Sequence, residues 1–122
     1  MATTILSRNL LSVVASTTGV GGTAVNVDIG YVPSYVRCLD VTNGSIEFVW
    51  SQGLNGATGG SSITGYFASS SAGGDVQFST IAAGAGGLSS LDGSAGTGIG
   101  FVIGTNTTIN LAGHAYHCMA WR

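Results

Sequence analysis

The chain has 122 residues, enough for one domain with a two-layer core and too few for a second independent core. Only three residues are basic and five acidic, 7% of the chain, where an ordinary globular domain carries about a quarter. This excludes the basic stripe that nucleic-acid binding requires and favours a protein whose surface is covered by contacts with other chains.

The N-terminal third predicts one clear strand. Residues 5–14 mix Leu and Val without a clear period, so the opening segment, residues 1–20, can form an N-terminal arm, an edge strand or a short helix. From 24 to 29 aliphatic and polar side chains alternate, which predicts a half-buried strand with the aliphatic side chains inward. Pro33 breaks this pattern, and we expect the next strand to begin after it.

A hairpin is predicted around Asn43–Gly44, the pair that a type I′ turn prefers. The flanking strands are residues 35–42 and 45–51. With a two-residue loop, the core face consists of the cross-strand pairs Val41 with Ile46, Leu39 with Phe48, and Arg37 with Trp50.

The same register opposes two carboxylates, Asp40 and Glu47, on the other face of the hairpin. Facing like charges destabilise a sheet unless something separates or neutralises them. We expect solvation or a different register first, then pairing with an arginine such as Arg37, and a bound cation last.

The remaining sequence predicts short strands between long loops rich in Gly, Ser and Ala. Residues 53–74 are expected to be loops around one short strand, and 82–98 a second long loop. No segment has a convincing helical period. Further strands are expected at 75–81, 99–103, 107–111 and 114–121, the last three as a meander around a turn at 104–106.

These elements predict an all-β fold, an antiparallel β-sandwich or jelly-roll-like barrel in one domain of residues 1–122. Cys38 and Cys118 each lie in an apolar, strand-like run. We expect two free buried thiols, with one intramolecular disulfide as the alternative, because a chain of this size does not depend on a covalent crosslink.

The sequence predicts no catalytic, cofactor or metal site. His114 and His117 are three residues apart on a predicted strand, so they point to opposite faces and cannot share a zinc ion with Cys118. Cys118 as a nucleophile lacks an orienting acid or amide fixed by spacing. A calcium site would draw on Asp28, Asp40 and Glu47, but no ligand loop of fixed spacing is present.

Three other motifs are interpreted as structural. Gly96–Gly100 is similar in spacing to a dinucleotide loop, but no helix begins there and no Lys follows. The sequons at Asn43 and Asn106 are interpreted as turn residues. Leu10–Ala15 is too short for a signal peptide core, and no run is long enough to span a membrane, so we expect synthesis in the cytoplasm and no membrane partner.

Two groups of motifs resemble small virion proteins of tailed bacteriophages. The first runs from Gly30–Val36 through Asp40–Gly44 to Ile46–Trp50. The second comprises Gly100–Asn106 and Ile109–Gly113, followed by Tyr116, Ala120 and Trp121, and it resembles the closing hairpin of those modules. The resemblance covers about half of the chain and implies a β-sandwich on the particle, as a capsid decoration or cement protein or a head-fibre or tail-associated module. It carries no functional residue over.

The expected function is therefore non-enzymatic: a virion protein that forms homo-oligomers, trimers before dimers, and binds the major capsid protein or another virion protein. The alternative is a fibre-associated module that binds carbohydrate or a cell surface through aromatic side chains. The direction of those side chains distinguishes the two functions. The candidate aromatic residues are Tyr31, Trp50, Tyr66 and Phe67.

Overall fold

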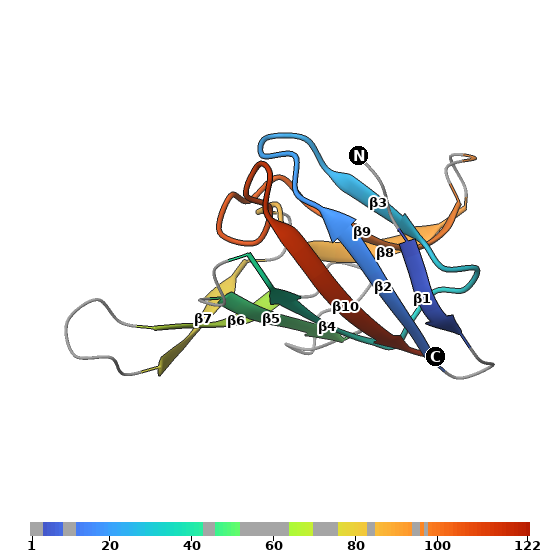
Figure 1. Ribbon diagram of the computed structural model, residues 1–122, viewed down its shortest axis with the longest axis horizontal. Helices are drawn as coiled ribbons and strands as arrows, with labels where there is room; N and C mark the ends of the chain where they lie inside the picture. Colours follow the sequence, from blue (N-terminus) through green and yellow to red (C-terminus); the bar gives the residue numbers. More distant parts are fainter. Residues whose placement is uncertain are drawn as a thin grey trace.

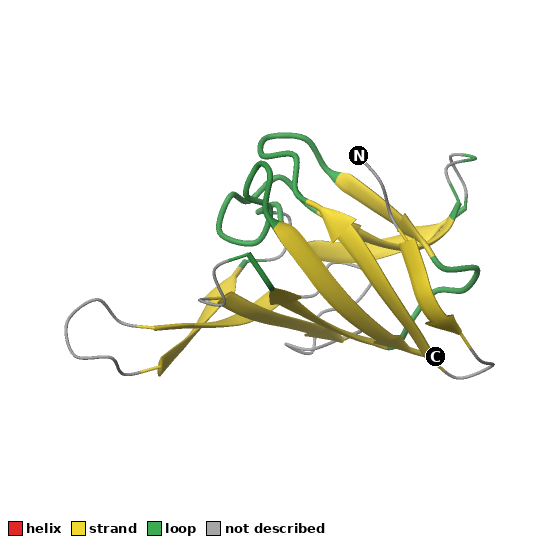
Figure 2. Ribbon diagram, in the orientation of Figure 1, coloured by secondary structure: helices red, strands yellow, loops and turns green. Residues whose placement is uncertain are grey.

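A computed structural model describes residues 4–8, 12–42, 46–51, 64–69, 76–82, 85–93, 96 and 98–122. Within these residues every regular element is a β-strand, arranged in two antiparallel sheets (Figures 1 and 2). The predicted all-β fold is confirmed, and the two sheets form a β-sandwich of short strands.

The larger sheet has seven strands in the order β1-β2-β10-β4-β5-β6-β7, and the smaller has three in the order β3-β9-β8. β4 to β7 follow one another as a meander. The C-terminal strand β10 lies between β2 and β4, so it joins the N-terminal hairpin to the meander (Figure 1). The strands are β1 (Thr4–Arg8), β2 (Ser12–Thr18), β3 (Val25–Asp28), β4 (Tyr35–Asp40), β5 (Ile46–Ser51), β6 (Thr64–Ser69), β7 (Val76–Ile81), β8 (Leu88–Asp92), β9 (Ile99–Ile103) and β10 (Ala115–Trp121).

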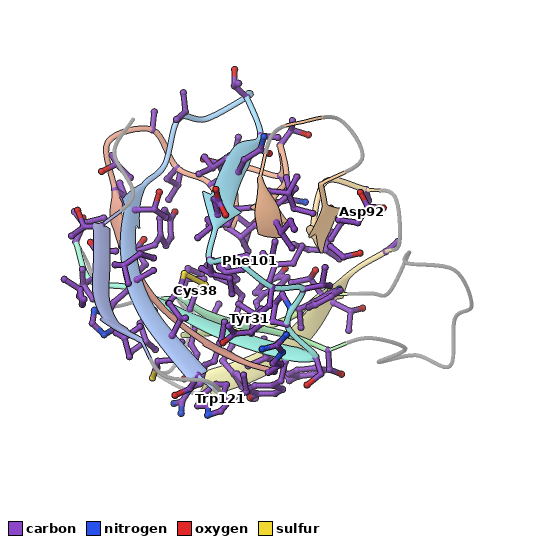
Figure 3. All side chains as sticks on the ribbon, turned by 90° about the vertical axis from the view of Figure 1, so that its right-hand side faces the viewer. Tyr31, Cys38, Asp92, Phe101 and Trp121 are labelled. Carbon is purple, nitrogen blue, oxygen red and sulfur yellow. A yellow bond between two sulfur atoms is a disulfide. The ribbon has the colours of Figure 1, made fainter. Side chains whose placement is uncertain are left out.

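The hydrophobic core lies between the two sheets. Alternate residues of β2, β4, β5 and β10 are buried, as the two-residue period of a strand with one inward face requires. In Figure 3, Cys38 from the large sheet and Phe101 from the small sheet lie in this interior. The largest fully buried side chains are Trp50, Tyr116, Phe48, Phe101, Ile29 and Ile103.

Several predicted strands are confirmed. Residues 24–29 contain β3, with Val25, Val27 and Ile29 buried, and the strand that follows Pro33 begins at Tyr35. The predictions at 75–81, 99–103 and 114–121 correspond to β7, β9 and β10. Of the three alternatives for residues 1–20, the structure has strands: β1 is an edge strand paired with β2.

Two predictions in the C-terminal half were wrong. Residues 82–98 were expected to be loop, but β8 lies within them and pairs with β9. Residues 107–109 form a turn and 110–111 are irregular, so no strand lies there, and β9 and β10 form no meander and belong to different sheets.

Asn110 explains the second error. Its side chain is buried and holds two loops together: Oδ1 accepts from the Val20 and Gly21 amides at 2.8 and 3.2 Å. Its Nδ2 donates to the carbonyls of Thr23 and Gly104 at 2.9 and 2.8 Å. Four hydrogen bonds to one amide side chain, three of them to the distant loop after β2, replace the ladder that a strand would need.

The predicted hairpin register was wrong by one residue. Leu39 pairs with Glu47, Cys38 with Phe48, Arg37 with Val49 and Val36 with Trp50. The connection between the strands is therefore longer than two residues, and Asn43–Gly44 lies outside the described residues. Because a one-residue slip exchanges the faces of a strand, Val36, Cys38 and Asp40 are buried in place of the expected Arg37, Leu39 and Val41.

The expectation of two free thiols was also wrong. Cys38 and Cys118 form a disulfide, with a Cα–Cα distance of 4.1 Å. They are direct cross-strand partners on β4 and β10, and both side chains point into the core. The close approach of their Cα atoms is typical of a non-hydrogen-bonded antiparallel pair, where side chains of opposite residues lie nearest to each other.

Candidate functional site

The most unusual surface of the protein is the outer face of the seven-stranded sheet, on the side away from the core. The outward residues of β10, β4, β5, β6 and β7 lie in register across five neighbouring strands. A sheet with one solvated face normally carries polar side chains there. This face is instead largely apolar. Its apolar side chains are Met119, Trp121, Tyr35, Leu39, Val49, Phe67 and Phe78.

One ion pair lies in the middle of this apolar surface. The Arg37 guanidinium donates through Nε to Glu47 Oε1, with 43% and 29% of the two side chains exposed. The hydrogen bond to Glu47 and the negative charge of that carboxylate raise the pKa of Arg37 above its ordinary value. The two side chains are diagonal neighbours on adjacent strands, since Arg37 is opposite Val49 and Glu47 is opposite Leu39.

The two carboxylates that were predicted to face each other, Asp40 and Glu47, lie on opposite faces of the sheet. They do not meet, because the register differs from the predicted one. Arg37 pairs with Glu47 as expected among the alternatives, and it does not lie against Trp50, which is buried in the core.

Two aromatic pairs lie on the same face. Phe67 and Phe78 are cross-strand partners with ring centroids 5.0 Å apart. Phe67 is 37% exposed and Phe78 is 55% exposed. The Phe78 ring lies over Gly65, where an added Cβ would be 2.6 Å from it. Tyr35 and Trp121 pair at the other end of the face, with centroids 5.2 Å apart, and Figure 3 shows Trp121 at the outside of the molecule.

Asp40 lies at the end of β4 and has a fully buried side chain. Its Oδ2 is 2.7 Å from His114 Nδ1, and its Oδ1 accepts from the Thr42 amide at 3.0 Å. Burial, together with the nearby Asp40 carboxylate, raises the pKa of Tyr116, while the hydrogen bond from the Leu111 amide opposes this shift. A carboxylate on Nδ1 is the orienting half of a catalytic triad, but no described residue hydrogen-bonds to the other ring nitrogen of His114.

The structure separates the other residues that were weighed as catalytic or zinc-binding. His117 lies on the outer face of β10, whereas His114 precedes the strand and faces Asp40. Cys118 is in the disulfide and has no thiol to offer. Within the described residues no group of three His, Cys, Asp or Glu side chains could hold a metal ion.

The calcium and phosphate candidates are also apart. Asp28 lies on β3 of the small sheet, whereas Asp40 and Glu47 lie on β4 and β5 of the large sheet. Asp28 Oδ1 accepts from the Ile99 amide at 3.3 Å. Gly98 has a φ of 100°, and a Cβ there would be 2.6 Å from the Asp28 carboxylate. A negative charge against this loop disfavours a phosphate. Asn106 Oδ1 accepts from the Thr108 amide at 2.9 Å, which confirms the turn at that sequon.

Of the four aromatic residues considered for carbohydrate stacking, two point inward. Trp50 is 1% exposed and Tyr31 8%, and the Tyr31 hydroxyl donates to the Ala120 carbonyl at 3.1 Å. Tyr66 is half-buried and packs against the core, so only Phe67 presents a face to the outside. Sequence reasoning missed Phe78, Tyr35 and Trp121, because their exposure depends on which face of each strand is covered.

No protein-family model, curated protein or solved structure matches the chain. The described part of the chain contains no helix that is long and apolar enough to cross a membrane.

Proposed function

We propose that this chain is a non-enzymatic structural protein of a bacteriophage particle. In this proposal it is a capsid decoration or cement protein whose copies associate, as trimers in our first expectation, and bind the major capsid protein or another virion protein. The observation that carries the proposal is the outer sheet face, where mostly apolar side chains of the described residues surround the Arg37–Glu47 ion pair. Such a surface is poorly suited to water and well suited to contact with protein.

Two further observations support the proposal. The motifs around Asn43–Gly44 and Gly100–Asn106 resemble small virion proteins of tailed phages in sequence, although β9 and β10 do not form the closing hairpin that the second group implied. The Cys38–Cys118 disulfide favours a protein that ends up outside the reducing cytoplasm, as a released particle does, even where synthesis is cytoplasmic.

The test is to purify phage particles from the organism that encodes the chain and to probe them with an antibody raised against the purified chain. We expect the antibody to detect the chain in intact particles. We also expect a density map of those particles to show it on the capsid. Its absence from particles would contradict the proposal. Light scattering of the purified chain should give a mass of more than one chain. A monomer at micromolar concentration would contradict self-association, and only contacts with other virion proteins would then explain the low surface charge.

The second candidate is a head-fibre or tail-associated module that binds carbohydrate. The exposed Phe67–Phe78 pair favours it, since exposed rings on a sheet can stack on sugars. A glycan-binding assay separates the two candidates. Binding that is lost in Phe67→Ala and Phe78→Ala would support the module, whereas no binding together with assembly on the capsid would support the decoration protein.

A further inference from the structure

We infer that the outer face of the seven-stranded sheet binds a second copy of this chain around a two-fold axis, with Arg37 of one copy opposite Glu47 of the other. The inference rests on the proposed function and names the partner and the residues that meet, and it replaces the trimer expected there by a two-fold pair.

The surroundings of the ion pair define what a partner must offer. On the strands beside it, Arg37 lies between Met119 and Val49. Glu47 lies between Leu39 and Phe67 in the same way. The surface is thus a small, mostly apolar field with one positive and one negative group at its centre, and His117 lies at its edge, opposite Leu39.

Burying this field against a purely apolar partner would remove water from both charges without replacing it. The desolvation penalty of two charges in such a contact often exceeds their mutual attraction. A partner with a single net charge would match one group and repel the other. The fitting occupant carries one group of each sign amid apolar side chains, which is the description of this same face.

A two-fold contact satisfies that requirement. In an isologous interface the same patch lies on both sides, so residue i opposite residue j implies j opposite i. Placing Arg37 opposite the partner's Glu47 therefore places Glu47 opposite the partner's Arg37. The four charges then alternate in sign, and the guanidinium of Arg37 has enough N–H donors to serve both carboxylates.

The symmetry also restricts the number of chains. Particles built on this contact contain an even number of copies, so a trimer can occur only as a pair of trimers. A native mass that corresponds to one chain or to an odd number of chains would overturn the inference.

The sharpest test exchanges the two charges. The double variant Arg37→Glu with Glu47→Arg keeps an ion pair within each chain and keeps opposite charges across its own dimer. Mixed with the wild type, however, it would set guanidinium against guanidinium and carboxylate against carboxylate, a mismatch that is worth several kcal/mol. The composition is unchanged, so one of the two proteins is labelled with ¹⁵N for native mass spectrometry.

After unfolding and refolding the two proteins together, random association would give about half of all dimers as mixed pairs by the statistics of two equal species. We expect the mixed fraction to fall at least tenfold below that value, as repulsion between the like charges predicts. Mixed dimers at the random fraction would show that the two charges do not face each other across the contact, which overturns the inference.

A second pair of variants does not depend on the charge exchange. Leu39→Asp places a carboxylate in the middle of the face, and Val20→Asp makes the same change at an exposed apolar residue in the loop after β2. We expect Leu39→Asp to raise the dimer dissociation constant at least a hundredfold and Val20→Asp to leave it within threefold, roughly as one desolvated charge predicts. Denaturant unfolding of both checks that they are folded.

Failure of this inference differs from failure of the proposed function. The chain could be found on phage capsids while neither set of variants changes its association. In that case its copies meet through another surface, and only the inference fails. If the chain is absent from particles but dimers respond as expected, the contact stands and the proposed function fails.

Discussion

Loss of the Cys38–Cys118 bond should lower the stability of the protein more than any surface change. The bond links residues 80 apart in the sequence, so it restricts a large part of the unfolded chain. Closing a loop of about 80 residues removes about 15 cal/mol/K of chain entropy, or about 4.5 kcal/mol at 25 °C. Measured losses for native disulfides are about 2–5 kcal/mol, so we expect a loss of about 3–4.5 kcal/mol.

The assay compares one chain in two redox states. Protein reduced in denaturant and refolded under reductant is compared with the oxidised protein at one concentration, since the stability of an oligomer depends on concentration. For 122 residues the unfolding entropy is about 0.26 kcal/mol/K, so the melting temperature should fall by about 12–17 °C. A difference below about 1 kcal/mol would refute the reasoning, because the crosslink would then constrain little of the unfolded state.

Two other changes test the interior. Asn110→Ala should lower the free energy of unfolding by about 2–4 kcal/mol, because the Val20 amide and its neighbours lose their partners, whereas Asn106→Ala, which loses one bond at a turn, should lower it by about 1 kcal/mol. The raised pKa of Tyr116 predicts a contribution to the free energy of unfolding that is complete below pH 10. This contribution is lost as the pH rises above 10, since the tyrosine ionises in the unfolded chain before it ionises in the folded one. Denaturant titrations at successive pH values should show a smaller loss of unfolding free energy above pH 10 in Tyr116→Phe than in the wild type. An equal loss in both proteins would contradict this prediction.

The strands were predictable wherever one face is apolar and the other polar. Residues 24–29 alternate cleanly because the outer side of β3 carries Asn26 and Asp28, which lie in water. The burial of the strand follows from that pattern alone. By contrast, β8 was missed because its sequence, Leu88–Asp92, has two apolar residues amid small ones, and only pairing with β9 makes it a strand.

The disulfide and the Asn110 cluster were unpredictable for a different reason. Both join segments about 80 to 90 residues apart in the sequence. Cys38 and Cys118 become opposite residues only because β10 inserts between β2 and β4, and nothing in either local sequence specifies that strand order. Local patterns determine which residues share a face, whereas strand order determines which faces meet.

The error in the β4–β5 register has its own physical origin, and it bears on the proposed contact surface. A register is well specified when one face of a strand is apolar and the other polar, because a slip of one residue then exposes the core. In β4 both alternating sets carry apolar side chains, with Val36 and Cys38 inward and Tyr35 and Leu39 outward. A strand that is apolar on both faces is typical of one that is covered on both sides. The core covers the inner face, and the apolar outer residues that made the register ambiguous are the same residues on which the proposed contact with a second copy rests.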